Sequence, residues 1–394
     1  MPGIVRGSMA TLPRVTAEGT DLTGLDLRHH QVLHSLREHG PVVWLPSIGG
    51  WVVLSRQLAI SVMRDAATYT VDDPRFSTAQ VVGPSMLSLD GAAHRRHREP
   101  FAAAFLPAVV TPRDGPLITE QAHRLVRLLR PRGRAELRRE LAGRMAVAVA
   151  AAALGLDDTP VSALLGWYDL IVAAVNEVSS GGTASREGGE AVSSLAAAVR
   201  RAACRPDSLL ARIAQQMSDD ELVSNAAVFL FGGIETSEGM TSNVLHHLLA
   251  DPTQLEAVRA QPALVDSAIE ESLRLEPAAA RVDRYATADV ELGGVLIRRR
   301  DLVVVSLAAA NRDPEHFDEP DRFIVGRSNG RTHLSFATGP HACIGAQLAR
   351  LETRAVVGAV LEQLPGIELT SPVTTTGVIF RKPVGLHATW HPGG

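Results

Sequence analysis

Cysteine, lysine and aromatic residues are scarce in this chain of 394 residues. The two cysteines, Cys204 and Cys343, are too few for a disulfide framework and are compatible with a reducing compartment. Aromatic residues make up 4%, so the core must be built mainly from Ala, Leu and Val, and this composition, together with Arg and Glu, favours helices. Lys382 is the only lysine, so arginine carries nearly all positive charge. We attribute that bias to genome composition.

Charge and hydropathy exclude two further classes of protein. The formal net charge is -4, from 39 basic and 43 acidic residues, which gives no positive field of the kind that nucleic-acid binding requires. The longest apolar run, residues 145–154, falls well short of the roughly 18 residues of a membrane span. The N-terminal segment has no apolar core either. We therefore expect a cytosolic protein with no nucleic-acid and no membrane partner.

Periodicity predicts a mainly α protein with small β sheets. Apolar residues recur at helical spacing over residues 117–129, 141–156, 161–178 and 190–203. Short β-branched runs beside turns predict two small sheets, one from residues 42–45 and 50–54 and one from residues 290–297 and 302–307. Residues 1–20 are expected to form a loosely ordered tail, and residues 21–394 a single domain.

The longest predicted helix follows a capping signal. Ser218 is a candidate N-cap, Glu221 follows three residues later, and an apolar run covers residues 222–249. At about 30 residues and ~1.5 Å per residue, this helix would extend about 45 Å and cross a whole domain. Residues 179–189 are rich in Gly and Ser and lack periodicity, so we predict a flexible loop that acts as a lid.

The segment at residues 336–345 is the most informative in the chain. It contains, in order, Phe336, Gly339, His341, Cys343 and Gly345. A cysteine that must approach a flat macrocycle needs backbone freedom on both sides, which Gly339 and Gly345 provide. Residues 346–360 are predicted to be helical, so Cys343 would lie just before a helix N-terminus, where a thiolate is favoured. A buried, inert cysteine is the alternative; zinc is excluded, because Cys204 is distant and four ligands are lacking.

Residues 336–345 resemble the haem-binding loop of the cytochrome P450 family, whose pattern is Phe-x-x-Gly-x-His/Arg-x-Cys-x-Gly. The resemblance covers residues 25–390 in the family's motif order. It implies the family's triangular, mostly α prism with small β sheets, a haem b whose iron is axially ligated by the Cys343 thiolate, and O2 as co-substrate. Ala337 departs from the pattern, since many members have Gly there, and we expect only a slightly stiffer loop.

A second family motif lies in the long predicted helix. The family carries Ala/Gly-Gly-x-acid-Thr, and this chain has Gly232, Gly233, Ile234, Glu235 and Thr236. A threonine inside a helix can donate to the carbonyl four residues back, here that of Gly232, and two adjacent glycines weaken the helix enough to open a groove for O2. The resemblance implies that Glu235 and Thr236 relay protons for O–O cleavage. The alternative is an ordinary capping or solvent-facing Glu-Thr pair.

The resemblance also assigns haem-carboxylate partners. His94 and Arg98 lie four residues apart and would project from one helical face. By themselves they would indicate a basic surface patch. The resemblance makes them partners of a haem propionate, with Arg284 and His341 meeting the carboxylates from the other side, because arginine pairs with carboxylates in a bidentate way.

Glu271 and Arg274 lie three residues apart in a helix predicted over residues 266–275. As an isolated surface ion pair they would contribute little stability. The resemblance places them with Arg322 in a buried network behind the haem, and we interpret all three as structural rather than catalytic.

Substrate and partners also follow from the resemblance. The substrate would lie under residues 74–88 and the lid, against Val228, Phe231, Ala280, Val282, Val378 and Ile379. These residues are apolar or small, so we expect a mostly apolar organic substrate, hydroxylated or epoxidised in bacterial specialised metabolism; about half of them are as compatible with plain core positions. The sequence has no flavin segment, so we expect a monomer that receives electrons from a ferredoxin and ferredoxin reductase. Arg95 and Arg96 are candidate ferredoxin contacts.

Two other functions stay open. One is a haem-thiolate enzyme that uses peroxide or rearranges its substrate without O2, although the intact Glu235 and Thr236 argue against it. The other is a catalytically silent haem protein that serves as a recruitment module. A silent protein would show neither a substrate-induced spin shift nor any product.

Overall fold

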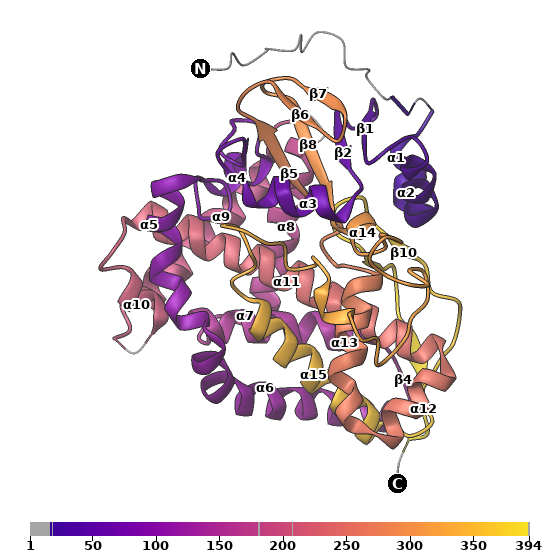
Figure 1. The fold of residues 1–394 in the computed structure, drawn as a ribbon. Coiled ribbons are helices and arrows are strands. Elements are labelled where there is room, and N and C mark those ends of the chain that lie inside the picture. Colours follow the sequence, from indigo (N-terminus) through magenta and orange to yellow (C-terminus); the bar gives the residue numbers. More distant parts are fainter. Residues whose placement is uncertain (1–15, 18, 180–181, 207, 393–394) are drawn as a thin grey trace, which may run out of the picture.

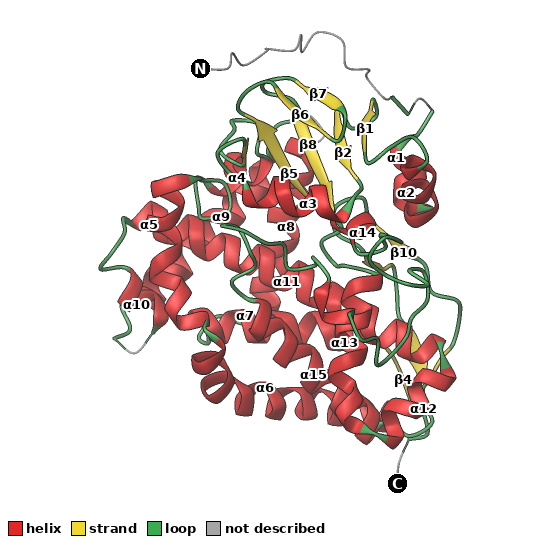
Figure 2. Cartoon of the chain, in the orientation of Figure 1, coloured by secondary structure: helices red, strands yellow, loops and turns green. Residues whose placement is uncertain are grey.

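The structure is a computed structural model that describes residues 16–17, 19–179, 182–206 and 208–392. Helices form most of the molecule, and a smaller β region lies at one end (Figure 1; Figure 2). Of the predicted tail at residues 1–20, residues 1–15 and 18 lie outside the described residues. Within the described part, Thr16 forms a β-bridge with Trp44, and Asp21 caps the first helix by accepting from the Gly24 N–H.

The predicted helices all exist, but several begin earlier or later than predicted. The α-helices are α1 (Leu22–Leu27), α2 (His29–Arg37), α3 (Arg56–Arg64), α4 (Ser77–Val82), α5 (Gly91–Ala102), α6 (Pro107–Leu129), α7 (Arg144–Leu154), α8 (Val161–Ser179), α9 (Arg186–Ala203), α10 (Leu209–Ile213), α11 (Asp219–Ala250), α12 (Pro252–Ala260), α13 (Val265–Leu275), α14 (Leu307–Ala310) and α15 (Ala346–Gln363). A π-helix, η4 (Arg138–Gly143), precedes α7.

Helix α11 is the central element of the fold. Its capping box is formed as predicted, with the Ser218 side chain accepting from the Glu221 N–H and the Glu221 carboxylate accepting from the Ser218 N–H. At 32 residues and about 1.5 Å per residue, it extends about 48 Å. It runs through the middle of the molecule and packs on α7, α13 and α15 (Figure 1). Most residues between Leu222 and Leu248 on this helix are therefore buried, whereas its first turn is exposed.

The predicted lid is shorter than residues 179–189. Helix α9 begins at Arg186, because the Ser185 side chain accepts from the Gly188 N–H and caps the helix. This cap outweighs the poor helix propensity of Gly188 and Gly189. The connection from α8 to α9 is reduced to residues 180–185, of which 180–181 lie outside the described residues.

Five strands form the main sheet, in the order β1 (Val42–Leu45), β2 (Gly50–Val53), β8 (Leu302–Ser306), β5 (Arg281–Ala286) and β3 (Tyr69–Thr70). Strand β8 pairs with β2 in parallel and with β5 in antiparallel orientation. The prediction of a second sheet containing residues 302–307 is therefore wrong. Residues 290–297 fold back on themselves as β6 (Val290–Leu292) and β7 (Val295–Ile297), because Gly293 and Gly294 take positive φ angles between them.

Two further small sheets lie outside the main β region (Figure 1). They are the pair β10 (Thr375–Thr376) and β11 (Lys382–Pro383), and the three strands β4 (Arg134–Glu136), β12 (His387–Thr389) and β9 (Glu368–Leu369). Strand β11 packs against α11, so the C-terminal part of the chain reaches the central helix. This long-range contact brings Lys382 near the Glu235–Thr236 motif.

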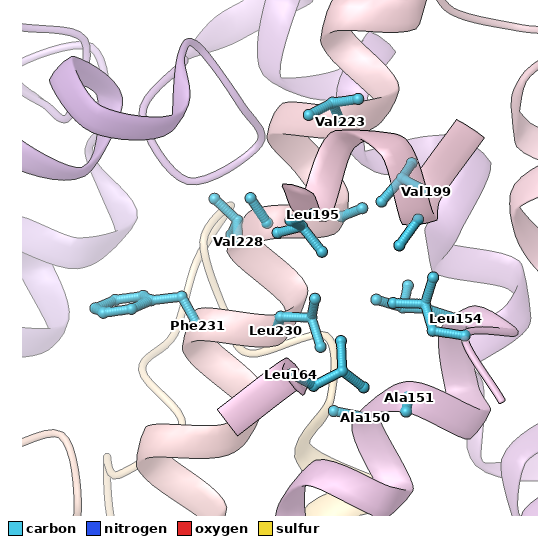
Figure 3. Packing of buried hydrophobic residues seen from close by; sticks show 14 of the residues in the cluster. Ala150, Ala151, Leu154, Leu164, Leu195, Val199, Val223, Val228, Leu230 and Phe231 are labelled. Atoms are coloured by element: carbon cyan, nitrogen blue, oxygen red, sulfur yellow. The ribbon is translucent and has the colours of Figure 1, made fainter. Parts of the chain in front are cut away.

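Helix α8 is, among the described helices, the one long and apolar enough to cross a membrane by length and composition, over Val161–Val178. This window is not one uninterrupted apolar run, because polar residues such as Asp169 and Asn176 lie within it. It was therefore not identified from the sequence. One face packs into the main core cluster, where Leu164 lies with Ala150 and Leu230 (Figure 3). Of the Val161–Val178 window, 28% is buried.

Candidate active site

A cavity of about 1110 Å³ lies inside the molecule. It brings together predicted residues from α11, β5, the loop before α15 and the C-terminal segment: Val228, Phe231, Gly232, Gly233, Thr236, Val282, Arg284, Phe336, His341, Cys343, Gly345, Val378 and Ile379, with Arg98 from α5. Of the predicted catalytic, haem-binding and pocket residues, His94, Glu235, Ala280 and Gly339 lie outside this lining, as do the three residues of the predicted structural network. In Figure 3, the ring of Phe231 points away from the packed side chains of Leu230 and Leu164.

The cysteine loop is held by a backbone hydrogen bond from the Cys343 N–H to the Phe336 carbonyl, at 2.8 Å. Gly339 has φ +77°, and a Cβ there would overlap the Met63 carbonyl oxygen and come within 3.0 Å of the Arg64 Cα. Only glycine fits this position, as predicted. Ala337 has φ +55°, in the left-handed region that favours glycine, so the effect of this departure is backbone strain rather than a slightly stiffer loop.

Gly345 behaves differently from its prediction. Its φ is -85°, which any residue can adopt, and no protein atom lies within 4 Å of an added Cβ. It is the N-cap of α15 and lines the cavity. Glycine at this position therefore leaves free space beside the cavity and does not supply a special backbone conformation.

The Cys343 side chain is accessible from the internal cavity. Burial raises the pKa of its thiol, while a hydrogen bond from the Gly345 N–H and the positive charges of Arg98 and Arg350 oppose this rise. Because α15 begins at Ala346, the thiol lies just before a helix N-terminus, as predicted. Cys204, in contrast, caps the C-terminal end of α9 and is exposed.

His94, Arg98 and His341 meet beside this loop. The His94 and His341 ring centroids lie 4.3 Å apart, so His341 is on the same side as His94 and not opposite it as predicted. The Arg98 Nη2 donates to the Ala342 carbonyl at 2.6 Å. Within the part of the chain that the structure describes, two buried ring nitrogens, Nε2 of His94 and Nδ1 of His341, have no hydrogen-bond partner.

Asp90 orients His341, and the sequence reasoning missed it. The His341 Nε2 lies 2.8 Å from the Asp90 Oδ1. Burial opposes ionisation of Asp90, but hydrogen bonds from His341, the Thr70 hydroxyl and the Val71 N–H outweigh it and lower the pKa of Asp90 to about 2. Asp90 is also the N-cap of α5, and its position before Gly91 is the signal that could have drawn attention to it.

Arg284 approaches the same group from strand β5. Its side chain is buried, its Nη1 donates to the Asp283 carbonyl at 2.8 Å, and burial lowers its pKa although Asp90 and Asp283 act in the opposite direction. Burial also lowers the pKa of His94 to about 4, helped by the charges of His341 and Arg98. The cavity wall therefore combines two guanidinium groups with the ring of His341. Among the described residues, the Nδ1 of this ring and the Nε2 of the adjacent His94 have no hydrogen-bond partner.

The two polar side chains of the α11 motif, Glu235 and Thr236, point in different directions. The Thr236 Oγ1 donates to the Gly232 carbonyl, as predicted, and both residues line the cavity. Glu235 is buried outside the cavity lining, with its Oε1 2.7 Å from the Lys382 Nζ. The capping or solvent-facing alternative for this pair is wrong, because Glu235 is in an ion pair inside the fold.

The predicted structural network forms with a different third arginine. Arg274 is fully buried and makes two hydrogen bonds to the Glu271 carboxylate, at 2.8 and 2.9 Å. Arg327 donates to the Glu271 Oε1 at 2.9 Å. Arg322 contributes only its carbonyl, which accepts from Arg274; its side chain pairs with Glu319 at the surface. The turn that begins at Glu319 directs the Arg322 side chain outward, so the prediction for that side chain is wrong.

The predicted pocket residues line the cavity with one exception. Ala280 is fully buried in the cluster that contains Val304 and Ala308, because its N–H and carbonyl are both bonded to neighbouring backbone. Polar and charged residues also line the cavity. Thr78 and Gln80 lie in the segment 74–88 that was predicted to cover the substrate, although neither was named. Prediction missed Asn176, Arg281 and Glu352, because their contact with the cavity depends on the tertiary fold.

Comparison with known proteins shows to which class this fold and this cavity belong. A family model described as Cytochrome P450 matches residues 201–365. The cytochrome P450 monooxygenase PikC of Streptomyces venezuelae is 33% identical over 330 residues, which cover 77% of this chain and 77% of PikC. Nocardicin C N-oxygenase of Nocardia uniformis is 30% identical over 372 residues, which cover 86% and 89% of the two chains.

A solved structure, that of CalO2, superposes with a TM-score of 0.85 at 31% identity and covers 93% of this chain and 96% of its own. The chain belongs to the cytochrome P450 family and is a monooxygenase, an oxidoreductase. The prediction of the family's mostly helical fold is confirmed.

Members of this family carry a haem whose iron is bound by a thiolate, and the residues present fit that group. A thiol opens onto the cavity at Cys343. The unpartnered nitrogens of His94 and His341 and the guanidinium groups of Arg98 and Arg284 are donors suited to two carboxylates. The donor set therefore matches both the metal and the propionates of a haem.

Proposed function

We propose that this chain inserts one oxygen atom from O2 into a mostly apolar organic substrate, by hydroxylation or epoxidation, with Cys343 as the iron ligand. One observation carries the proposal: the Cys343 thiol and the Gly232, Gly233 and Thr236 segment line the same cavity. When bound, the haem supplies the one-electron and O2 chemistry. The protein's residues bind it, orient the substrate and deliver protons.

Haem b would be held on the cysteine side by a set of charges. His94, Arg98, Arg284 and His341 would bind its carboxylates, and Asp90 would keep the His341 ring in place. Coordination to a metal deprotonates a thiol outright, which would overcome the effect of burial on Cys343. Phe336 and Gly339 would fix the loop that carries this thiol, and the Gly345 N–H would donate to its sulfur.

Protons would reach the reaction through α11. Thr236 lines the cavity, and its Oγ1 would pass a proton to the reaction. Glu235, which lies outside the lining, would supply this proton. A peroxide-using or rearranging enzyme would not need this pair. The intact motif therefore favours the monooxygenase over that alternative.

The substrate would contact mainly apolar groups, with a few polar groups to orient it. Val228, Phe231, Val282, Val378 and Ile379 are apolar, whereas Thr78, Gln80 and Asn176 offer hydrogen bonds. The names of PikC and nocardicin C N-oxygenase indicate specialised bacterial metabolism for those proteins, and we propose the same setting for this chain.

Electrons would come from a ferredoxin and ferredoxin reductase. Arg95 is exposed on α5 and is a candidate contact. Arg96 is a weaker candidate, because its guanidinium pairs with both oxygens of Glu221. A monomeric, cytosolic protein stays a prediction.

The test is a substrate screen followed by turnover. A bound substrate should shift the haem spin state, and NADPH, ferredoxin and ferredoxin reductase should then give an oxygenated product. Thr236→Ala should divert electrons to hydrogen peroxide, whereas Thr236→Ser, which keeps the hydroxyl, should stay coupled. No spin shift and no product with any ligand would favour the recruitment module; product from peroxide with an unaffected Thr236→Ala variant would favour the peroxide-using enzyme.

A further inference from the structure

The single lysine of the chain binds the acid of the α11 motif. The Lys382 Nζ lies 2.7 Å from the Glu235 Oε1 and 2.7 Å from the Glu238 Oε2. Lys382 comes from strand β11, near the C-terminus of the chain, and its side chain is 19% exposed. One ammonium group therefore joins two carboxylates on successive turns of the same helix.

Glu238 is held from its other side by the π-helix η4. Its side chain is fully buried, and its Oε1 lies 3.2 Å from the Arg138 Nη1 and 3.8 Å from the Arg139 Nη1. Arg139 is 44% exposed and also pairs with the surface residue Asp169. The charges thus continue without a break from Glu235, through Lys382 and Glu238, to the solvent.

Two glycines make room for this arrangement. A Cβ on Gly143 would come within 3.0 Å of the Glu238 Oε1, so a side chain there would crowd the carboxylate. A Cβ on Gly239 would come within 3.0 Å of the Ala278 Cβ and 3.5 Å of the Lys382 Cβ. Gly239 lets β11 lie close enough to α11 for Lys382 to reach both carboxylates, and π-helical turns are frequent at functional sites.

The Glu235 carboxylate points to Lys382 and not into the cavity. Thr236 lines the cavity, but its neighbour Glu235 is turned to Lys382 and lies outside the described cavity lining. To exchange a proton with Thr236, the Glu235 carboxylate must leave Lys382. Leaving a buried ammonium without a partner would be unfavourable, but Glu238 stays bound to it.

We propose that Lys382 is the positioning residue of Glu235: it holds this carboxylate outside the cavity, and Glu238 keeps Lys382 paired when Glu235 turns to Thr236. Glu238 and the two arginines of η4 extend the ion-paired group to the surface. Solvent water there supplies the proton that Glu235 regains, because an arginine does not give up its own. The inference rests on the proposed role of Glu235 and Thr236 and extends it to residues from β11 and η4.

Because the chain has a single lysine, labelled lysine reports on Lys382 alone and no other lysine has to be replaced. Incorporation of lysine labelled with carbon-13 at the ε position gives one resonance, that of Lys382, in the full chain with or without haem. Glu235→Gln and Glu238→Gln should each shift this resonance, because each removes a carboxylate 2.7 Å away. Glu187→Gln, on an exposed glutamate of α9, is the matched control and should leave it unchanged. If Glu235→Gln leaves the Lys382 resonance unchanged, the ion pair between Lys382 and Glu235 is refuted.

Turnover of the loaded enzyme provides the second readout. Lys382→Met should lower product formed per NADPH about tenfold, a partial loss of what a general acid contributes, with the electrons appearing as hydrogen peroxide. Lys382→Arg, which keeps the positive charge, should restore most of the coupling. Arg132→Met removes an ion pair to Glu140 of the same π-helix and should leave the coupling unchanged.

The outcomes separate this inference from the proposed function. If Glu235→Gln stays coupled, the relay itself is wrong, whatever Lys382 does. If Glu235→Gln is uncoupled while folded Lys382→Met is coupled like the wild type, the relay stands and the positioning role of Lys382 is refuted. Uncoupling in both, with rescue by Lys382→Arg, supports the inference.

Discussion

Replacing Gly339 by alanine tests the geometry of the cysteine loop. Gly339 has φ +77°, and its Cβ would overlap the carbonyl oxygen of Met63, which is backbone and cannot rotate away. The left-handed conformation costs about 1–2 kcal/mol for a non-glycine residue, and the overlap adds the roughly 1–3 kcal/mol of overpacking. We therefore expect Gly339→Ala to lower the free energy of unfolding by about 2–5 kcal/mol.

A second substitution in the same loop should act in the opposite direction. Ala337 has φ +55°, so Ala337→Gly removes about 1–2 kcal/mol of strain against about 0.5–1 kcal/mol of added chain entropy. The variant should be more stable than the wild type, by up to about 1.5 kcal/mol. Urea unfolding followed by far-ultraviolet circular dichroism measures both variants. A Gly339→Ala protein within about 0.5 kcal/mol of wild type, with its haem content intact, would refute the reasoning.

Two further predictions concern buried charges. Burial raises the pKa of Glu352 to about 8, against the hydrogen bond from Ser237, so the folded protein keeps a proton that the unfolded chain has lost above about pH 4.5. The free energy of unfolding of the wild type should therefore fall as the pH rises from about 4.5 to 8. Glu352→Gln should remove this fall and raise Tm at pH 8. Parallel pH profiles of Tm for the variant and the wild type would contradict this prediction. Arg327→Ala should cost about 3 kcal/mol by leaving the Glu271 carboxylate short of a partner, whereas Arg322→Ala, a surface change, should cost under about 0.5 kcal/mol in the same urea assay. Equal costs for the two arginines would contradict the assignment.

Local signals in the sequence predicted most of the helical framework. Ser218 and Glu221 identify the start of α11 because a capping box depends on neighbouring residues alone. The start of α9 was missed because Ser185 was assigned to a Gly-rich loop, although it caps the helix. Strand β8 was placed in the wrong sheet, because its pairing with β2 joins segments about 250 residues apart.

The candidate active site shows the same difference between local motifs and long-range contacts. Cys343, Gly339 and Thr236 stand in compact motifs, and the resemblance of these motifs to those of the family predicted their place at the cavity or its loop. Lys382 could not be predicted in this way, because its partners lie on α11, and only the packing of β11 brings them together. Arg327 was missed for a related reason: the direction of a turn decided which arginine reached Glu271.

The most direct test of the whole account is the carbon monoxide difference spectrum of the dithionite-reduced protein. Thiolate ligation of the iron by Cys343 predicts a Soret band near ~450 nm, and Cys343→Ser should abolish it. A band near ~420 nm in a folded wild-type sample, or no haem at all, would contradict thiolate ligation at Cys343. An unchanged ~450 nm band in Cys343→Ser would contradict it equally.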